Sequence, residues 1–498
     1  MQSYHVHNFG CRASAADGDS IAAALEREGG LEAGTLEGAG VVVVNTCAVT
    51  AEAERSARAL IRRVRRVNPG ARVVVTGCYA QRAPGEVRGL PGVDAVVGNS
   101  HKGAVARVAL GGVEGHSLAG GSAGFVPVSR LTERLHTPFG ERWVSGVFAG
   151  EHGMESELPI ATGGARTRPI LKVQDGCGNR CSFCVIPQTR GASRSVGLGE
   201  AVGAARLFAE GGGQELVLSG INLGRWGRDL QPARTLPELV RALLEETGLP
   251  RLRISSVEPM DWTGEMLAML AQYGGGEHPR LAPHAHLPLQ SGADEILRRM
   301  HRRYRPWHYA EKVGALRELL PDAAIGADVM VGFPGETEAL FRESYEFIEK
   351  QPLTYLHLFP FSSRPGTAGE GLHRAAPVHG GAVKERMGAL QRLAARKAAA
   401  FAESFVGRRV SAVTLRDGTA LTGNFFRVRF ADCLEVKSAD VVQVGAGDVG
   451  EGRAADVVQV GAAEGWVANQ LVSLRVAFVE ENMEGNMLVG VPEVPAAV

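Results

Sequence analysis

Three cysteines near residue 180 form the strongest chemical signal in the sequence. Cys177, Cys181 and Cys184 have a C-x3-C-x2-C spacing inside the polar segment VQDGCGNRCSFCVIPQTRGASR. Three thiols this close together can bind one inorganic centre without help from the rest of the chain, and Gly178 and Asn179 suit a tight loop. The spacing therefore predicts a metal site with three cysteine ligands.

The missing fourth ligand narrows the kind of metal site. A structural zinc ion is normally held by four Cys or His side chains, whereas this segment contains no His and no fourth Cys. The alternatives are free core thiols, a disulfide with a spare thiol, and zinc with a distant fourth ligand. A polar loop is poor core material. We favour a four-iron cluster in which three irons are held by protein and the fourth has an open position.

Three more cysteines each end a short β-rich run. Cys11, Cys47 and Cys78 close the runs YHVHNFGC, VVVVNTC and RVVVTGC, and helix-like segments at residues 19–28 and 51–67 lie between them. Alternating strands and helices predict a parallel sheet whose strands all end at the edge where open α/β sheets bind ligands. We therefore expect these three cysteines to meet there and to hold a second iron–sulfur cluster. A chance placement at three strand ends is the alternative.

Composition bounds the remaining possibilities. The 498 residues predict about two to four domains, and 45% hydrophobic with 22% charged residues is ordinary for a globular protein. The net charge of zero means that any nucleic-acid binding depends on local patches. No stretch reaches the roughly 20 apolar residues that span a bilayer, so we expect no membrane partner and a cytoplasmic protein. Cysteines then favour metal chemistry over disulfides, and Cys433 is expected to be a small apolar filler.

The region after the cysteine loop alternates between helical and strand-like segments. This pattern predicts a full or partial TIM-like barrel, with functional groups at the carboxyl ends of its strands. The strand expected at residues 169–173 leads into the cysteine loop and places it at that end. Further helices are expected at residues 199–210 and 236–247, and further strands at residues 215–218, 251–255 and 324–331.

Polar residues and glycines near the expected strand ends are candidates for binding a cofactor. A carboxylate there could bind a ribose hydroxyl, and a Gly-rich strand edge lets the backbone approach an amino-acid group. A structural hydrogen bond explains any single one of them equally well. For His284 and His286, packing and hydrogen bonding are favoured over metal binding. The cofactor candidates are Gly212, Gly213, Glu215, Ser256, Glu258 and Gln290.

Basic residues point to RNA at the helix expected over residues 51–67. Six arginines lie between residues 55 and 66 with no acidic residue among them. In a chain without net charge this density favours a phosphate-binding surface, with Arg58, Arg62 and Arg65 as the contacts. A solvated helix face is the alternative.

From residue 405 onward, short β-like runs separated by turn residues predict a small antiparallel β-barrel. Phe426 and Arg427 would suit base stacking and phosphate contact in RNA, although neighbouring strand residues face opposite sides and one of Phe425 and Phe426 is expected in the core. The segment ADVVQVGA occurs twice, at residues 439–446 and 455–462, which indicates a duplicated insertion within about residues 431–468.

These patterns define the expected domain organisation. The fold class is an α/β multidomain chain with an open parallel α/β sheet, a partial TIM-like barrel and a small β-barrel. The expected ranges are 1–105 for the N-terminal α/β domain, 106–162 for a Gly-rich linker, 163–400 for the central domain and 404–490 for the C-terminal barrel.

The cysteine loop resembles the signature of the radical S-adenosylmethionine (SAM) superfamily. Over residues 9–430 the chain further resembles the methylthiotransferases of that superfamily. The resemblance to the branch acting on N6-threonylcarbamoyladenosine in tRNA rests on three segments, NTCAVT, IRRVRRVNPGARVVVTGCYAQ and IPQTRGASRS. The resemblance implies a central radical SAM core and a C-terminal RNA-binding barrel of the TRAM type.

The resemblance also implies the cofactors and partners. Cys177, Cys181 and Cys184 would be catalytic, holding the [4Fe-4S] cluster at which SAM is cleaved to a 5′-deoxyadenosyl radical. The N-terminal trio would hold an auxiliary [4Fe-4S] cluster involved in sulfur delivery. The implied partners are tRNA, an external electron donor and a sulfur source. The alternatives are methylthiolation of isopentenyladenosine in tRNA or of a ribosomal-protein aspartate, and a non-catalytic iron–sulfur protein that binds RNA.

Overall fold

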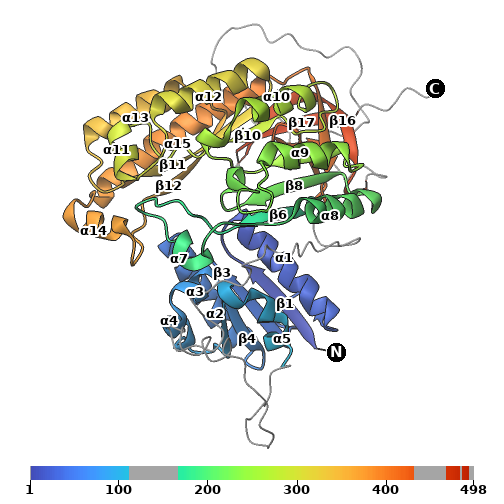
Figure 1. The fold of residues 1–498 in the computed structure, drawn as a ribbon, viewed down its shortest axis with the longest axis vertical. Coiled ribbons are helices and arrows are strands. Elements are labelled where there is room, and N and C mark those ends of the chain that lie inside the picture. The colour runs from blue at the N-terminus through green and yellow to red at the C-terminus, as the bar shows by residue number, and fades with distance from the viewer. Residues whose placement is uncertain (1, 112–166, 431–466, 483–484, 493–498) are drawn as a thin grey trace, which may run out of the picture.

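Three structural units follow one another along the chain (Figure 1). The computed structural model describes residues 2–111, 167–430, 467–482 and 485–492, and comprises an N-terminal α/β domain, a central α/β domain and a C-terminal barrel. The predicted fold class is confirmed. Most of the predicted linker lies outside the described residues, as do Cys433, the duplicated segment and most of the predicted insertion.

The N-terminal domain is built on a five-stranded parallel sheet with strand order β2-β1-β3-β4-β5. Every residue of β3 is buried, as expected for a parallel strand that is covered on both faces. The predicted parallel arrangement is confirmed, with β2 and β5 in addition. The strands are β1 (Ser3–Asn8), β2 (Leu31–Glu32), β3 (Val41–Thr46), β4 (Arg72–Gly77) and β5 (Ala95–Gly98).

Local sequence explains where the second helix of this domain begins and which face it buries. The Thr50 side chain accepts a hydrogen bond of 3.2 Å from the backbone N–H of Ala53, which caps the first turn. Leu60, Ile61 and Val64 are spaced to form one apolar face, and all three are buried. The helices are α1 (Arg12–Arg27), α2 (Ala51–Val67), α3 (Cys78–Arg82), α4 (Pro84–Arg88), η1 (Asn99–Ala104) and α5 (Val105–Ala109).

The central domain contains two sheets that are joined into one. The sheet β7-β6-β8-β9 is linked to the sheet β10-β11-β12 by isolated parallel bridges, Leu252 to Leu281 and Ser256 to His286. All pairs are parallel except β6 with β7. A partial barrel is therefore confirmed. Its strands are β6 (Ile170–Asp175), β7 (Arg194–Ser195), β8 (Glu215–Gly220), β9 (Arg251–Ile254), β10 (His284–His286), β11 (Ala324–Val331) and β12 (Tyr355–Pro360).

Helices cover the outer face of this sheet and enclose a large apolar core (Figure 1). The last of them, α15 (Gly380–Glu403), packs on β12 and extends to the C-terminal barrel. The other helical segments are α7 (Ile186–Arg190), α8 (Leu198–Glu210), η2 (Leu223–Arg225), α9 (Leu236–Glu245), η3 (Pro259–Asp261), α10 (Gly264–Tyr273), α11 (Asp294–Arg299), α12 (Pro306–Leu319), α13 (Glu338–Lys350) and α14 (Ala368–Ala375).

The C-terminal unit is a closed five-stranded barrel with strand order β13-β14-β15-β17-β16. Strand β17 was not predicted, and it pairs with β15 in parallel, so the barrel is mixed and not purely antiparallel. The cause is topological, because β16 and β17 form a hairpin and β17 then closes the barrel against β15. The strands are β13 (Arg409–Thr414), β14 (Thr419–Thr422), β15 (Arg427–Phe430), β16 (Leu471–Asn482) and β17 (Gly485–Pro492).

A group of buried charges joins the N-terminal and central domains. Helix α1 lies against β6 (Figure 1), and at this contact the carboxylate of Asp17 pairs with Lys102, Lys172 and Arg190. Asp175 pairs with the same three cations, at 2.9 Å from Arg190, 3.1 Å from Lys172 and 3.3 Å from Lys102. We call these five side chains the interdomain charge cluster. Burial alone would raise the pKa of both carboxyl groups, but the cations outweigh it and keep the carboxylates ionised.

A second buried ion network joins the central domain to the barrel. Arg253 donates to the backbone oxygens of Thr422 and Gly423, both at 2.9 Å, while Arg251 donates to the hydroxyl of Ser411. Both arginines lie next to Glu215, which is fully buried. Burial alone would raise the pKa of Glu215, but Arg253 and then Arg168 outweigh this effect and lower it to about 2. The barrel is therefore fixed to the amino ends of β8 and β9.

Among the described helices, none combines the length and the apolar character that crossing a membrane requires.

The interdomain charge cluster predicts a large stability effect for Asp17→Asn. This substitution leaves three buried cations with one carboxylate, and breaking a buried ion pair typically costs about 3–5 kcal/mol. We expect the first urea unfolding transition of the anaerobically purified protein to shift to lower urea by a corresponding amount. The control is Arg396→Ala, which removes an exposed pair with Glu349 and should change the free energy of unfolding by no more than about 1 kcal/mol. Equal transitions for the two variants would contradict this role of the cluster.

Candidate active site

One cleft of about 630 Å³ lies where the N-terminal domain faces the carboxyl ends of the central strands. Its walls include Cys11 from the N-terminal domain, and Cys177, Cys181 and Cys184 from the loop after β6. Both predicted cysteine trios thus have a member on the same cavity. A ligand that fills the cleft therefore lies beside Cys11 of one trio and all three cysteines of the other.

The loop between β6 and α7 carries the first trio. Cys177 anchors the loop, since its backbone N–H donates to the oxygen of Gly191 at 3.0 Å. Gly176, directly before it, has a φ of +71°, and a Cβ atom there would lie 1.9 Å from the oxygen of Ala192. No other residue type fits this position without moving the backbone. The glycine therefore sets the start of the loop.

Hydrogen-bond donors surround the sulfur atoms of this loop. Cys177 Sγ receives the backbone N–H of Asn179 at 3.4 Å and the side-chain amide of Asn222 at 3.5 Å. Cys181 Sγ receives a guanidinium N–H of Arg302 at 3.3 Å. The N–H donors at Cys177 and Cys181 stabilise thiolate, the form in which cysteine binds metal. At Cys184 burial acts in the opposite direction and raises the pKa of the thiol to about 12.

The second trio stands at the ends of three neighbouring strands. Cys11 follows β1, Cys47 directly follows β3, and Cys78 directly follows β4. Gly10 has a φ of +101°, and a Cβ atom there would lie 2.7 Å from the Cβ of Cys47 and 2.8 Å from its Sγ. Only a glycine lets the β1 loop come this close to the β3 end. The predicted placement at one sheet edge is confirmed.

Electrostatics also place the members of the second trio near one another. Burial and the nearby thiols of Cys78 and Cys11 together raise the pKa of Cys47 to about 12. The backbone N–H of Val49 donates to Cys47 Sγ, and the side-chain amide of Asn99 to Cys78 Sγ, both at 3.4 Å. All six cysteines of the two trios are free thiols, so the disulfide alternative is wrong for the described residues.

The spacing of the sulfur atoms favours iron–sulfur clusters over single metal ions. Three thiolates on one zinc ion at 2.3 Å would lie about 3.8 Å from one another. In the described part of the chain, only His286, Asp328 and His357 form a group of three potential ligands that all lie within 4.8 Å of one another. Each cysteine trio is more widely spread. Ligands on three separate irons of one cluster stand farther apart, so this spread favours a [4Fe-4S] cluster with one open iron over a single zinc ion.

Polar atoms without partners face the cleft next to the cysteine loop. Ser255 Oγ, Asn222 Oδ1 and Gln290 Oε1 are buried and have no hydrogen-bond partner, and all three residues line the cavity. Gln290 also has a φ of +68°, a conformation that non-glycine residues adopt rarely. Buried polar atoms normally have partners, so these three fit a polar ligand such as SAM. Asn222 was missed in the sequence, although it follows the carboxyl end of β8.

The predicted cofactor residues divide into two groups. Ser256 and Glu258 line the cleft together with Gln290, and Glu258 pairs with Arg302. The predicted positions of Ser256, Glu258 and Gln290 therefore agree with the position of the cavity. The other three, Gly212, Gly213 and Glu215, lie at the amino end of β8 and do not line the cleft.

The prediction for Gly212, Gly213 and Glu215 is therefore corrected. The carboxyl end of β8, with Ser219 and Gly220, is the end that lines the cavity. Glu215 instead joins the ion network beneath the barrel, with Arg253 at 2.8 Å and Arg168 at 2.6 Å. The negative charge of Glu215 is therefore already balanced by arginines of this network.

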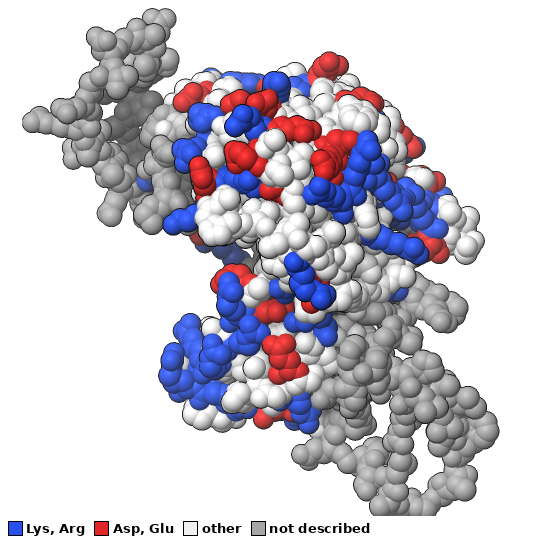
Figure 2. Space-filling model, turned by 90° about the vertical axis from the view of Figure 1, so that its left-hand side faces the viewer, with Lys and Arg blue, Asp and Glu red and all other residues white. Residues whose placement is uncertain are grey.

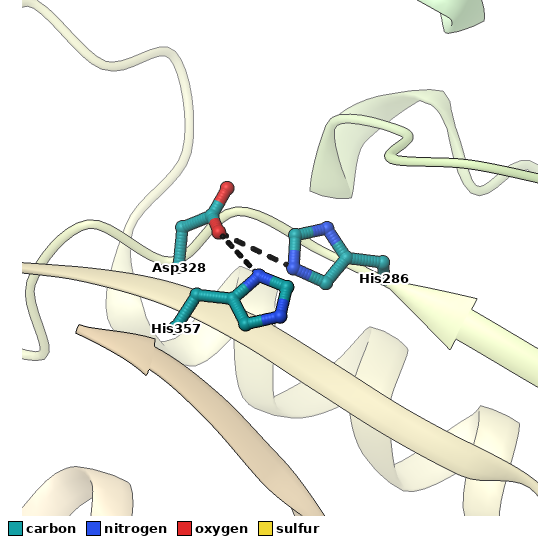
Figure 3. Close-up of side chains that lie close together, drawn as sticks. All are labelled: His286, Asp328 and His357. Atoms are coloured by element: carbon teal, nitrogen blue, oxygen red, sulfur yellow. Dashed lines mark ion pairs between the residues drawn. The ribbon is translucent and has the colours of Figure 1, made fainter. Parts of the chain in front are cut away.

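Two histidines and one aspartate form a compact group on the cleft wall (Figure 3). One carboxylate oxygen of Asp328 lies 3.3 Å from His286 Nε2 and 3.3 Å from His357 Nδ1. Burial alone would raise the pKa of Asp328, but the two imidazoles hold it below its ordinary range. His286 Nδ1 lies 2.7 Å from the hydroxyl of Ser256. His284 is buried and bonds to Tyr355 at 2.7 Å, in agreement with its predicted role in packing and hydrogen bonding.

The predicted RNA-binding arginines have different environments. Arg58 donates to the Tyr79 hydroxyl and pairs with Glu86, and Arg65 donates to three backbone oxygens and pairs with Asp94. Arg62 is exposed. Figure 2 shows Lys and Arg side chains along one edge of the lower lobe, which holds the N-terminal domain, with acidic groups beside them. RNA contact by all three arginines stays a prediction, and Arg58 and Arg65 would have to exchange an acidic partner for a phosphate.

The predicted base-stacking residue of the barrel faces inward. Phe426 packs in the barrel core against Phe401 and Phe405, with ring centroids 5.1 Å and 5.7 Å apart. Its role in base stacking is therefore corrected to a structural one. Phe425 is the residue that faces outward, toward the central domain. Arg427 is exposed and pairs with Asp417 at 2.8 Å.

The contact between Gly10 and Cys47 predicts selective loss of the second cluster in Gly10→Ala. The added methyl group overlaps Cys47, so we expect iron and sulfide to fall to about half, as in Cys47→Ala, while the cluster on Cys177, Cys181 and Cys184 remains. Iron and sulfide analysis with Mössbauer spectroscopy after anaerobic reconstitution measures this. The matched control is Gly178→Ala, because nothing lies within 4 Å of a Cβ atom there. Full iron content in Gly10→Ala would contradict the prediction.

Comparison with known proteins agrees with this geometry. Residues 171–348 match the family model described as the radical SAM superfamily, and residues 3–98 match the uncharacterized protein family UPF0004. The threonylcarbamoyladenosine tRNA methylthiotransferase of Aquifex aeolicus is 35% identical over 84% of this chain and 95% of its own length. That of Bacillus subtilis is 36% identical over 74% of this chain and 75% of its own length.

A relative whose name gives a different product has almost the same sequence identity to this chain. The tRNA-2-methylthio-N(6)-dimethylallyladenosine synthase of Thermobifida fusca is 33% identical over 82% of this chain and 77% of its own length. Radical SAM enzymes use SAM and a [4Fe-4S] cluster, and the two cysteine trios fit two such clusters. The cysteine geometry and these identities together show that the chain belongs to the radical SAM methylthiotransferase family.

Proposed function

We propose that this protein adds a methylthio group to C2 of N6-threonylcarbamoyladenosine beside the anticodon of tRNA. The observation that carries the proposal is one cleft lined by all three cysteines of the central loop and by Cys11 of the N-terminal trio. A radical generator and a sulfur-bearing cluster must both reach the same base, and one cavity meets that need. The substrate follows the printed names of the relatives from Aquifex aeolicus and Bacillus subtilis.

Within this proposal, the residues of the cysteine loop hold and orient the cofactors. With its cluster bound, this site supplies the SAM-derived radical that abstracts a hydrogen atom from the target base. Cys177, Cys181 and Cys184 would be the cluster ligands. Arg302 and Asn222 would stabilise the thiolates through the N–H groups that they already direct at sulfur.

The polar groups of the cleft would hold SAM itself. Gln290 Oε1 and Ser255 Oγ have no partner and would meet hydrogen-bond donors and acceptors of the cofactor. Ser256 and Glu258 would complete this part of the wall. Cys11, Cys47 and Cys78 would hold the auxiliary cluster opposite.

The RNA surface would combine the N-terminal helix α2 with the barrel. Arg62, Arg63 and Arg66 are exposed on α2 and have no acidic partner among the described residues. Such side chains suit phosphate contacts. Arg427 on the barrel is exposed but would have to exchange Asp417 for a phosphate.

The proposed reaction also sets the requirements for partners and location. An external electron donor would reduce the radical-generating cluster, and a sulfur source would renew the sulfur that leaves with each product. Both reagents and tRNA occur in the cytoplasm, and we propose that compartment.

A second candidate substrate is N6-dimethylallyladenosine in tRNA. The relative from Thermobifida fusca, with that printed product, is nearly as similar as the relatives named for the threonylcarbamoyl substrate. A non-catalytic RNA-binding iron–sulfur protein is less consistent with the cleft, because binding RNA does not require unpartnered polar atoms beside a three-cysteine loop.

Nucleoside mass spectrometry of tRNA from a strain lacking the gene tests the proposal. We expect loss of 2-methylthio-N6-threonylcarbamoyladenosine and accumulation of the form without the methylthio group. Wild-type protein should restore the product, whereas Cys177→Ala and Cys47→Ala should not. The purified variants separate the two sites, because Cys47→Ala should still cleave SAM to 5′-deoxyadenosine with dithionite and Cys177→Ala should not. Loss of the methylthio mark from dimethylallyladenosine alone would assign the other substrate.

A further inference from the structure

Arg12 is a charged residue in the cleft without a protein partner. It is the first residue of α1, it follows Cys11 directly, and it lines the cavity while being half-buried. In the described part of the chain its side chain forms no hydrogen bond and no ion pair. The guanidinium of Arg12 lies over the ring of Phe425, and the ring centroid is 5.8 Å from the guanidinium carbon.

The other sheltered arginines of the described residues behave differently. Each fully buried one lies within 4 Å of a carboxylate, as electrostatics requires of a charge removed from water. The pairs are Arg190 with Asp17, Arg251 and Arg253 with Glu215, Arg302 with Glu258, Arg364 with Glu54, and Arg386 with Glu336. Arg12 is only half-buried, but it lacks such a partner at a place where a ligand is expected.

The nearest acidic group does not satisfy Arg12. Asp328 forms no ion pair with Arg12, and its carboxylate already contacts His286 and His357 at 3.3 Å each (Figure 3). Burial lowers the pKa of Arg12 from its ordinary value, and Arg253 lowers it further, although Tyr355 and Asp328 act in the opposite direction. An arginine nevertheless keeps its charge in a protein. Among the described residues the guanidinium thus has spare donors and no carboxylate partner.

The surroundings of Arg12 suit a planar ligand that carries an anionic group. The imidazole of His357 is half exposed on the cleft wall, and its ring centroid lies 5.3 Å from that of Tyr355. Phe425, beneath the guanidinium, lies 5.8 Å from Tyr355 in turn. Of these three rings only that of His357 lines the cleft, where it can pack against a nucleobase, while Tyr355 and Phe425 support it and Arg12 from behind. The guanidinium beside it can bind a carboxylate through two parallel hydrogen bonds.

The two purine substrates differ in the group that Arg12 would meet. A threonylcarbamoyl substituent ends in a free carboxylate, whereas a dimethylallyl substituent is apolar. An apolar group would leave the cation without a partner, and a site built for a charged group discriminates strongly against an analogue that lacks it. The anionic end of SAM is expected elsewhere, next to the open iron of the Cys177 cluster and the unpartnered atoms of Asn222 and Gln290.

We propose that Arg12 binds the carboxylate of the N6 substituent on the target adenosine and thereby selects threonylcarbamoyladenosine over dimethylallyladenosine. This inference rests on the proposed function and names the residue that determines its substrate. Arg12 acts as a specificity residue: it touches the substituent, while C2 of the same base faces the cysteine sites.

Direct binding tests the inference without requiring turnover. We would measure dissociation constants of the reconstituted holoenzyme for anticodon stem-loop RNAs by fluorescence anisotropy. One RNA carries threonylcarbamoyladenosine, a second carries its carboxamide analogue, and a third carries dimethylallyladenosine. The wild type should bind the acid about 10- to 100-fold more tightly than the amide, the range for a charge-assisted hydrogen bond. Arg12→Gln should bind acid and amide equally, and Arg12→Lys should restore part of the preference.

Matched measurements separate this role from the others that a cation could have. The control is Arg241→Gln on α9, which removes an exposed pair with Glu265 of α10. This variant should keep the wild-type preference for the acid over the amide. Arg12→Gln should retain the iron content and RNA-independent SAM cleavage of the wild type. Equal weakening of acid and amide binding would assign Arg12 to the RNA backbone, and loss of SAM cleavage would assign it to the cofactor. Either result overturns the inference.

Turnover measurements with the same RNAs distinguish failure of the inference from failure of the proposed function. A wild-type enzyme that methylthiolates the acid and the amide with equal kcat/KM refutes the role of Arg12 and leaves the activity in place. A wild-type enzyme that prefers the acid in binding but forms no methylthio product refutes the activity and supports carboxylate binding by Arg12.

Discussion

Five charged side chains buried between two domains hold the whole site together. Asp17 and Lys102 come from the N-terminal domain, and Lys172, Asp175 and Arg190 come from the central one. Separating the domains would leave each set incompletely paired unless water replaced the lost contacts, and buried charges gain most when every partner is present. Arg190 also ends the segment that carries the cysteine loop. The same contact that docks the domains therefore sets the position of one cysteine trio relative to the other.

A second buried ion network holds the C-terminal barrel at the opposite end of the central strands. Glu215 gathers Arg168, Arg251 and Arg253, and two of these arginines reach into the barrel. The two networks thus lie at the two ends of the same parallel sheet. Both ends of the sheet therefore contribute to domain packing, and the carboxyl ends in addition line the cleft. Glu215 lies at the end without the cleft, so its carboxylate has a structural role.

Short-range patterns predicted the parts of the fold that short-range forces determine. The runs of valine that end at Cys47 and Cys78 predicted the strands, and right-handed connections then required these residues to share one edge. The strand expected at residues 215–218 does begin at Glu215, so the boundary was right. The error was to take polar residues at the amino end of this strand as members of the site at its carboxyl end. Short-range patterns also could not pair Arg58 with Glu86, or orient Phe426, because side-chain partners across the fold decide both. Arg12 was missed for the same reason, since its lack of a partner is visible only in three dimensions.

Phe425 is the point at which all three units of the protein meet. It sits on the barrel with a φ of +70°, it contacts Arg12 of the N-terminal domain, and it packs against His284 and Arg253 of the central domain. A residue shared in this way makes the packing of each unit depend on the other two. A substitution at Phe425 would change the surface beneath Arg12 from a third unit of the chain, even when every residue of the central domain is kept.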